Sequence, residues 1–179
     1  MGLVEAKMKV LEKLWEEGKP VALKDVAQKT GLKVAATNMH LLGLKKTGHV
    51  SAPLHGYYAI TEQGKEAIGL PKLDKTHATK ILSHVSTDKA FHFYTGLHQH
   101  LGVHANSLGD FCDKIEKVSV KTVEFHVPRK DFENWFRSLG DIELAKRMSL
   151  IHSMNLHGEE LRKKMHAAAK HRLEELKRI

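Results

Sequence analysis

Three stretches of helical periodicity, each closed by a glycine, constrain the first fifty residues more than any other feature of this chain. Residues 3–17 carry apolar side chains every three or four positions, which places them on one face of a helix. Gly18 ends this stretch, and Gly31 then separates a short helix at about residues 24–30 from a longer one at about 33–47. The predicted order is therefore helix, short helix, tight glycine turn and longer helix.

Two short strands and a further helix are predicted next. Val50 and Ala52, and then Tyr58 and Ile60, suggest two short strands, and the two pairs flank a Pro-Leu-His-Gly sequence typical of a hairpin turn. Thr61 then precedes the sequence EQGKEAI and supplies a hydroxyl of the kind that caps a helix.

Residues 3–70 resemble the winged helix-turn-helix fold of prokaryotic transcription regulators. Ala27 and Gly31 stand four apart, as in the first helix and the turn of that family. Leu41 and Leu44 stand where the family's recognition helix packs inward. The sequences LKKTGHV and YAITEQGKEAI match the end of that helix, the wing and the helix after it. The resemblance implies a DNA-binding domain over residues 1–70.

In this family the recognition helix lies in the major groove, and here that helix is residues 33–47. The predicted DNA contacts are Lys33, Val34, Ala35, Asn38, Met39, Lys45, Lys46 and His55. Asn38 is the strongest candidate for reading a base, because an amide pairs bidentately with adenine. The small apolar side chains suit thymine methyl groups, the lysines suit phosphates, and His55 lies at the wing tip.

These residues also have structural interpretations. Asn38 can simply be solvated, Met39 can belong to the core, and lysines near a helix end favour the helix dipole. Thr37 stands where the family usually has an aliphatic residue, although its methyl group can still pack. Residues 1–128 contain no arginine, which weakens the case for reading a minor groove with the wing. Winged helices also mediate protein contacts, so the fold alone does not establish DNA binding.

The distribution of charge supports a polyanion as partner. The net charge is +8, and no acid occurs between Asp25 and Glu62. That interval holds Lys29, Lys33, Lys45, Lys46, His40, His49 and His55. A basic patch of this kind attracts nucleic acid by releasing counterions. The alternative is a solvated surface that lacks acids by chance.

Composition argues against several other classes of protein. No apolar run approaches the roughly 20 residues of a membrane helix. The first residues alternate charged and apolar side chains, unlike a signal peptide. Cys112 is the only cysteine, which excludes an internal disulfide and a cysteine-based zinc finger. These features favour a cytoplasmic protein without a membrane contact.

The remainder of the chain is predicted to be a connector, residues 71–89, followed by a mostly helical domain, residues 90–179. The connector carries one short helix around residues 79–85. The sequence FHFYTG favours a short strand or a buried turn, and VKTVEFHV favours a strand or a bent connector. The overall class is therefore mainly α, with a small β wing in the N-terminal domain.

Four helices are predicted after residue 105. They cover the sequences SLGDFCDKIEKV, RKDFENWFRSL and IELAKRMSLIHSM and a long final stretch from Gly158. Asn106 or Ser107 is the expected cap of the first, and Asp141 is the expected cap of the third. The final helix is strongly basic, which predicts either a solvated face or a surface for a second copy or a polyanion.

Residues 90–152 also resemble an uncharacterised prokaryotic domain of unknown function. Besides FHFYTG, the matching residues are His126, Asp131, Phe132, Trp135, Gly140, Asp141, Glu143, Leu144 and Ala145. The resemblance implies a compact helical module and no established chemistry. His126 is a candidate functional group, although a hydrogen-bonded structural histidine is the more common interpretation.

Nothing in the sequence indicates an enzyme. There is no phosphate loop, dinucleotide fingerprint or nucleophile elbow, and Cys112 falls in an apolar helical pattern. Four of the 14 histidines crowd one stretch: His92, His98, His100 and His104. The last two would share a helix face at a spacing that can bind zinc, but Gly102 separates them and no third ligand has a fixed position. The sequence therefore predicts no catalytic residue, no metal site and no cofactor.

The favoured interpretation is a transcriptional regulator that binds double-stranded DNA as a homodimer. Its C-terminal domain would dimerise, sense a ligand or contact a partner. One alternative is an adaptor that uses the winged helix to dock proteins, and another is a histidine–metal-dependent regulator or hydrolase. Because many histidines titrate just below pH 7, polyanion binding is expected to strengthen from about pH 7.5 to 6.

Overall fold

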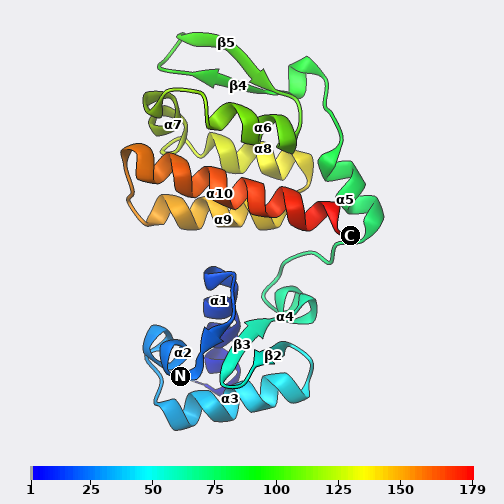
Figure 1. The fold of residues 1–179 in the computed structure, drawn as a ribbon, viewed down its shortest axis with the longest axis vertical. Helices are drawn as coiled ribbons and strands as arrows, with labels where there is room; N and C mark the ends of the chain where they lie inside the picture. Colours follow the sequence, from blue (N-terminus) through cyan, green and yellow to red (C-terminus); the bar gives the residue numbers. More distant parts are fainter. Residues whose placement is uncertain (1) are drawn as a thin grey trace. The chain divides into compact units, whose positions relative to one another are not determined.

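The computed structural model describes residues 2–179, in two compact units: one up to Lys72 and one from Leu73 to Ile179 (Figure 1). Helices dominate both units, and each unit contains a small antiparallel sheet. The predicted mainly α class is confirmed. Within the described residues, none of the helices has the length and apolar character needed to cross a membrane.

Unit 1, up to Lys72, combines helices with a three-stranded sheet. Its elements are α1 (Leu3–Glu17), β1 (Val21–Ala22), α2 (Leu23–Thr30), α3 (Val34–Lys46), β2 (Val50–Leu54), β3 (Tyr57–Ile60) and α4 (Glu62–Ala67). Strand β3 lies between β1 and β2, with Val21 opposite Tyr58 and Val50 opposite Ile60. This layout is consistent with a winged helix whose wing is β2 and β3. The sequence did not predict β1, because two residues carry no periodicity.

The direction of α3 is set by the turn at Gly31. Gly31 has a φ of 69°, and across this turn the Leu32 N–H donates to the Ala27 carbonyl oxygen at 3.2 Å. A residue without Cβ adopts this left-handed conformation at little cost. The predicted glycine turn is therefore present between α2 and α3.

A second glycine lets α4 approach the turn between α3 and β2. A Cβ on Gly64 would lie 2.2 Å from the His49 carbonyl oxygen, closer than any substitution allows. Beside it, the Thr61 hydroxyl accepts the Gly64 N–H at 3.1 Å and donates to the Gly48 carbonyl oxygen at 2.6 Å. Thr61 therefore caps α4, as predicted, and also fixes α4 against the start of the wing.

The core of unit 1 lies between α1, α2 and α3. Its largest buried side chains include Val10, Leu11, Leu14, Trp15, Val26, Leu41 and Leu44. Thr37 is buried as well, and its hydroxyl donates to the Lys33 carbonyl oxygen at 3.1 Å within the same helix. The buried hydroxyl is thus satisfied by the backbone. His40 is also buried, so it does not belong to the basic surface that the sequence suggested.

Unit 2, from Leu73 to Ile179, packs helices against a two-stranded hairpin. Its helices are α5 (Lys75–Leu82), α6 (Leu108–Ile115), α7 (Val120–His126), α8 (Asp131–Leu139), α9 (Ile142–Ser153), α10 (Gly158–Lys177) and the short 3₁₀ helix η1 (Thr87–Lys89). The hairpin pairs β4 (Phe91–Tyr94) with β5 (His100–Ala105), placing His92 opposite His104. Within this unit, the hairpin covers one side of the helices and α9 and α10 lie on the other (Figure 1).

Aromatic rings fill the core of unit 2. Phe111 contacts Phe136 at 4.9 Å and Phe132 at 5.4 Å between ring centroids, and Phe91 and Phe93 reach the same cluster from β4. Ala78 and Ile81 of α5 belong to this core too. The segment 71–89 therefore contains a packed helix, which begins at Lys75 rather than near Thr79.

Two predicted elements of unit 2 are corrected. Residues 120–126 form the helix α7, not a strand or a bent connector, and its buried residues Thr122, Val123 and His126 follow helical spacing. The β-branched residues of VKTVEFHV imitate strand alternation, but Ser119 accepts the Thr122 N–H at 3.3 Å and starts a helix. His100 lies on strand β5 rather than on a helix.

The helices from α8 to α10 occur where the sequence predicts them. The carboxylate of Asp141 accepts the Leu144 N–H at 3.0 Å and so caps α9. The same carboxylate is 3.0 Å from Nε of Arg172, whose Nη1 reaches Glu143 at 2.9 Å and Glu175 at 2.7 Å. Burial disfavours the charged guanidinium, but these acids outweigh it and raise the pKa of Arg172. A buried ion cluster thus joins α9 to the basic helix α10.

Candidate nucleic-acid interface

The exposed side of α3 gathers the residues predicted to contact DNA. Of the predicted residues on α3, Val34, Ala35, Met39, Lys45 and Lys46 are exposed and Asn38 is half-buried, and Leu42 among them is exposed as well. At 3.6 residues per turn they fall within an arc of about 140°. Asn38 is half-buried and Met39 is 58% exposed, so Met39 is not part of the core. Lys33, just before the helix, is exposed as well.

Leu42 is the residue of this surface that the sequence did not single out. It lies near the middle of the arc and is 52% exposed, and Val34 in the same arc is 47% exposed. Its position one residue after Leu41 gave the only available signal, since the two neighbours on a helix cannot both face the core. The centre of the α3 surface is therefore apolar, with basic residues around it.

The wing adds a second exposed strip. Leu54 and Tyr57 are 63% and 44% exposed, and His55 is exposed between them. Gly56 takes a φ of 77° at the turn, and its carbonyl oxygen accepts the Leu23 N–H at 3.1 Å. This hydrogen bond continues the pairing of β1 with β3 by one residue and fixes the base of the wing tip.

Charge in unit 1 is segregated. Lys33, Lys45 and Lys46 are exposed and make no ion pair within residues 2–179. The acids of the unit lie on α1, α2 and α4, and Lys29 of α2 is paired with Glu17 of α1 at 2.7 Å. The α3 surface and the wing therefore carry positive charge with no acid among residues 26–61.

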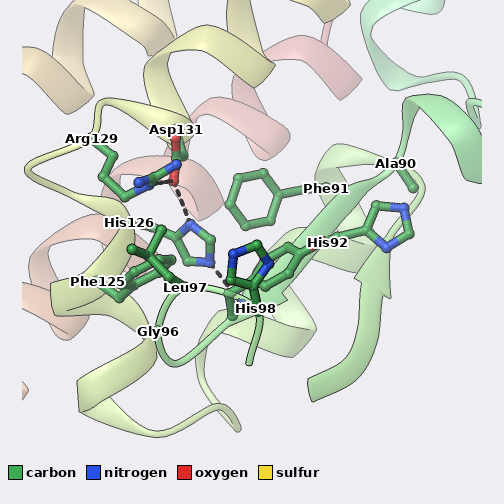
Figure 2. Close-up of a pocket in the computed structure, with 11 residues that line it drawn as sticks. Ala90, Phe91, His92, Gly96, Leu97, His98, Phe125, His126, Arg129 and Asp131 are labelled. Atoms are coloured by element: carbon green, nitrogen blue, oxygen red, sulfur yellow. Dashed lines mark hydrogen bonds and ion pairs between the residues drawn. The ribbon is translucent and has the colours of Figure 1, made fainter. Parts of the chain in front are cut away.

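Unit 2 contains a pocket of about 450 Å³ between the β4–β5 hairpin and the corner from α7 to α8 (Figure 2). His126 lines it, and both ring nitrogens are occupied. Nε2 accepts the Tyr94 N–H at 2.9 Å, so the ring proton is on Nδ1 and is donated to Asp131 at 2.8 Å. Burial lowers the pKa of His126, against the effect of Asp131. His126 thus joins β4 to α8 as a neutral structural residue.

Two of the four clustered histidines, His92 and His100, form a chain of hydrogen bonds on the hairpin. His92 Nε2 donates to the Thr87 carbonyl oxygen at 2.9 Å, and His100 Nδ1 accepts the Gly102 N–H at 2.9 Å. His100 Nε2 must then carry the proton that it donates to His92 Nδ1 at 3.2 Å. In the part of the chain that the structure describes, no three His, Cys, Asp or Glu side chains are arranged to hold a metal ion.

Cys112 is buried in the core of unit 2 rather than placed at a site. Its burial raises the pKa of the thiol to about 12. A thiol with so little thiolate at neutral pH is a poor nucleophile. The predicted buried thiol is therefore confirmed.

Comparison with known proteins identifies one domain. Residues 70–170 match DUF5752, a family of unknown function. The match extends the predicted range of the uncharacterised domain, 90–152, to include α5 and most of α10. No curated protein and no solved structure matches the chain.

Proposed function

The chain belongs to the DUF5752 family, whose function is unknown, and we propose from its own residues that it is a DNA-binding transcriptional regulator. In this proposal α3 enters the major groove of double-stranded DNA and the β2–β3 wing lies against the backbone. The protein acts in the cytoplasm as a homodimer, because a single winged helix reads few base pairs and two half-sites add affinity.

The observation that carries this proposal is the exposed arc of α3. It combines exposed lysines, a half-buried amide and small apolar groups, and residues 26–61, which include α3 and the wing, contain no acid. Phosphates are sequence-independent partners for Lys33, Lys45 and Lys46, and three such contacts predict a salt slope of about −3 per monomer. Asn38 suits adenine, and Val34 and Ala35 suit thymine methyl groups.

The test is selection from a pool of random duplex DNA. The whole protein is titrated into the pool at about 150 mM salt, where non-specific contacts are already weak, and the bound DNA is sequenced. An enriched motif supports a regulator, and a palindromic motif supports a dimer. Binding without enrichment contradicts sequence reading, and no binding contradicts the proposal.

A second candidate, a protein-docking adaptor, is favoured by the apolar part of the same surface. Leu42, Leu54 and Tyr57 are about half exposed, although DNA offers few apolar groups beyond thymine methyls. Leu42→Gln separates the two functions. Docking through an apolar centre would lose most of its affinity, because central apolar contacts dominate protein interfaces, whereas the salt slope of DNA binding, which the lysines set, would not change.

A further inference from the structure

We propose that the pocket of unit 2 binds a small organic anion, a carboxylate or phosphate ester attached to an apolar body. The pocket volume of about 450 Å³ lies in the range of small-molecule sites. It is lined by residues of β4, the hairpin turn, α7 and the start of α8, all inside the segment that matches the family. The inference does not depend on DNA binding by unit 1.

Arg129 is the group that would receive the anionic end. Its guanidinium lies 5.1 Å from the centroid of the Phe125 ring, and its Nε donates to Asp131 at 3.0 Å. These two contacts fix the plane of the guanidinium and leave the Nη edge for another partner. The side chain is 49% exposed, so that edge is reachable from solvent. A fixed guanidinium edge matches the two oxygens of a carboxylate or phosphate.

The charge of Asp131 is already used within the protein. One of its oxygens accepts both the Arg129 Nε–H and the His126 Nδ1–H (Figure 2). His126 is itself held by the Tyr94 N–H, so it cannot turn away to release that bond. Asp131 is therefore a positioning residue for Arg129, whose Nη edge is the group that the pocket offers to an anion.

The hairpin turn supplies the rest of the site. Residues 95–99 form a tight turn in which the Thr95 N–H donates to the Gln99 carbonyl oxygen at 3.1 Å. His98 has a φ of 60° in this turn, and its exposed imidazole can add a second N–H donor. Leu97 is 69% exposed and lines the same pocket as the buried Phe91. Leu97 and Phe91 would contact the apolar body.

The experiment is a titration of the full-length, isotope-labelled protein with four small probes, followed by two-dimensional amide NMR. The probes are benzoate, phenyl phosphate, benzylamine and benzyl alcohol, which share a ring and differ in charge. Both anions should shift signals in residues 91–98 and 125–131. At least one anion should bind about tenfold more tightly than the amine and the alcohol, as expected for charge-assisted hydrogen bonds.

Matched variants locate the binding. Arg129→Gln should weaken the anions about tenfold, whereas Arg137→Gln, the same change at an exposed position later in α8, should leave them unchanged. Leu97→Ala, at an exposed position that the fold does not need, should weaken the probes several-fold. The proposal is overturned if neither anion gives saturable shifts, or if the amine or the alcohol binds as tightly as the anions. It is also overturned if Arg137→Gln weakens anion binding as much as Arg129→Gln does.

Discussion

Helices α3 and α10 both carry basic residues, yet the structure uses their charges in opposite ways. Lys45 and Lys46 of α3 are exposed and have no ion pair within the described chain. Arg172 of α10 is buried and donates hydrogen bonds to three carboxylates, including Asp141. An exposed charge contributes little to the fold and stays available to a partner, whereas a buried charge must be satisfied inside the protein. The charge count of a helix therefore does not predict its role, but the position of each charge relative to the apolar stripe does.

The largest expected effect is on stability, from Arg172→Met. The change leaves the fully buried Asp141 without its cation and removes the nearer of the two arginines beside Glu143, and it should lower the free energy of unfolding of unit 2 by about 3–5 kcal/mol. Urea unfolding followed by Trp135 fluorescence, in a Trp15→Phe background, measures it. Lys170→Met, an exposed position on the same helix, should change the free energy by less than about 0.5 kcal/mol. If both changes lowered the free energy of unfolding equally, the contrast between buried and exposed charges would be wrong.

Asn38→Ala tests the exposed side of the comparison. If Asn38 reads adenine, the variant should lose about 1–3 kcal/mol of discrimination at one base position and keep its affinity for other sequences. Competition between duplexes that differ at single positions measures this loss. Asn134→Ala, at an exposed position in α8, serves as the control. Unchanged discrimination at every position would exclude Asn38 as a reading residue.

Within the described chain, Glu133 is a buried acidic residue without the hydrogen-bonded, oppositely charged partners that Arg172 has. Neither of its carboxylate oxygens has a hydrogen-bond partner in residues 2–179, and its Oε1 lies 3.9 Å from Nδ1 of His152, too far for a hydrogen bond. Burial raises the pKa of Glu133, so the native state binds its proton more readily than the unfolded state. The protonated Glu133 therefore contributes to the free energy of unfolding at low pH, and this contribution is lost as the pH rises through the raised pKa.

Glu133→Gln should therefore raise the free energy of unfolding by about 1 kcal/mol near pH 8 and by nothing near pH 3, where the glutamate is protonated in both states. Urea unfolding at the two pH values checks the difference. Glu174→Gln, at an exposed position of α10, should show no such pH dependence. A gain that is equal at both pH values would mean that the cause is packing and not charge.

The smallest expected effect belongs to Lys45→Ala. An exposed lysine on a phosphate should weaken binding to all DNA sequences alike and make the salt slope about one unit shallower. Binding at a series of salt concentrations measures this slope. Lys19→Ala removes an exposed lysine outside α3 and should leave it unchanged. A change that depends on sequence would instead place Lys45 at a base.

Local signals were sufficient to predict most of the fold. Helix α1 and the glycine turn at Gly31 follow from periodicity and backbone freedom, and the caps of α4 and α9 follow from Thr61 and Asp141. Where the outcome depended on distant partners, prediction failed. Residues 120–126 form a helix that buries Val123 in a core assembled from the whole unit, and β1 exists only because Tyr58 pairs with it.

The candidate sites show the same limit. The exposed residues of α3 were predicted because a helix has two sides and the inward leucines define one of them. The pocket of unit 2 was not predicted, because Arg129 and Leu97 meet only through the hairpin and the α7–α8 corner. The burial of Arg172 was missed for a similar reason: its spacing from Met165 and Ala169 fits the apolar stripe, but its partners lie on α9. The charges in the sequence predicted neither the pocket nor the burial of Arg172.

The close contact at Gly64 has a consequence for genetics. Every single-nucleotide missense change in a glycine codon introduces a side chain with a Cβ, and here that atom would meet the His49 carbonyl oxygen at 2.2 Å. We expect a screen for loss-of-function alleles to recover codon 64 alongside codons of α3. Alleles at codon 64 would act by disturbing the packing of α4 against the start of the wing. A map of alleles interpreted without the structure would therefore assign too large a surface to partner binding.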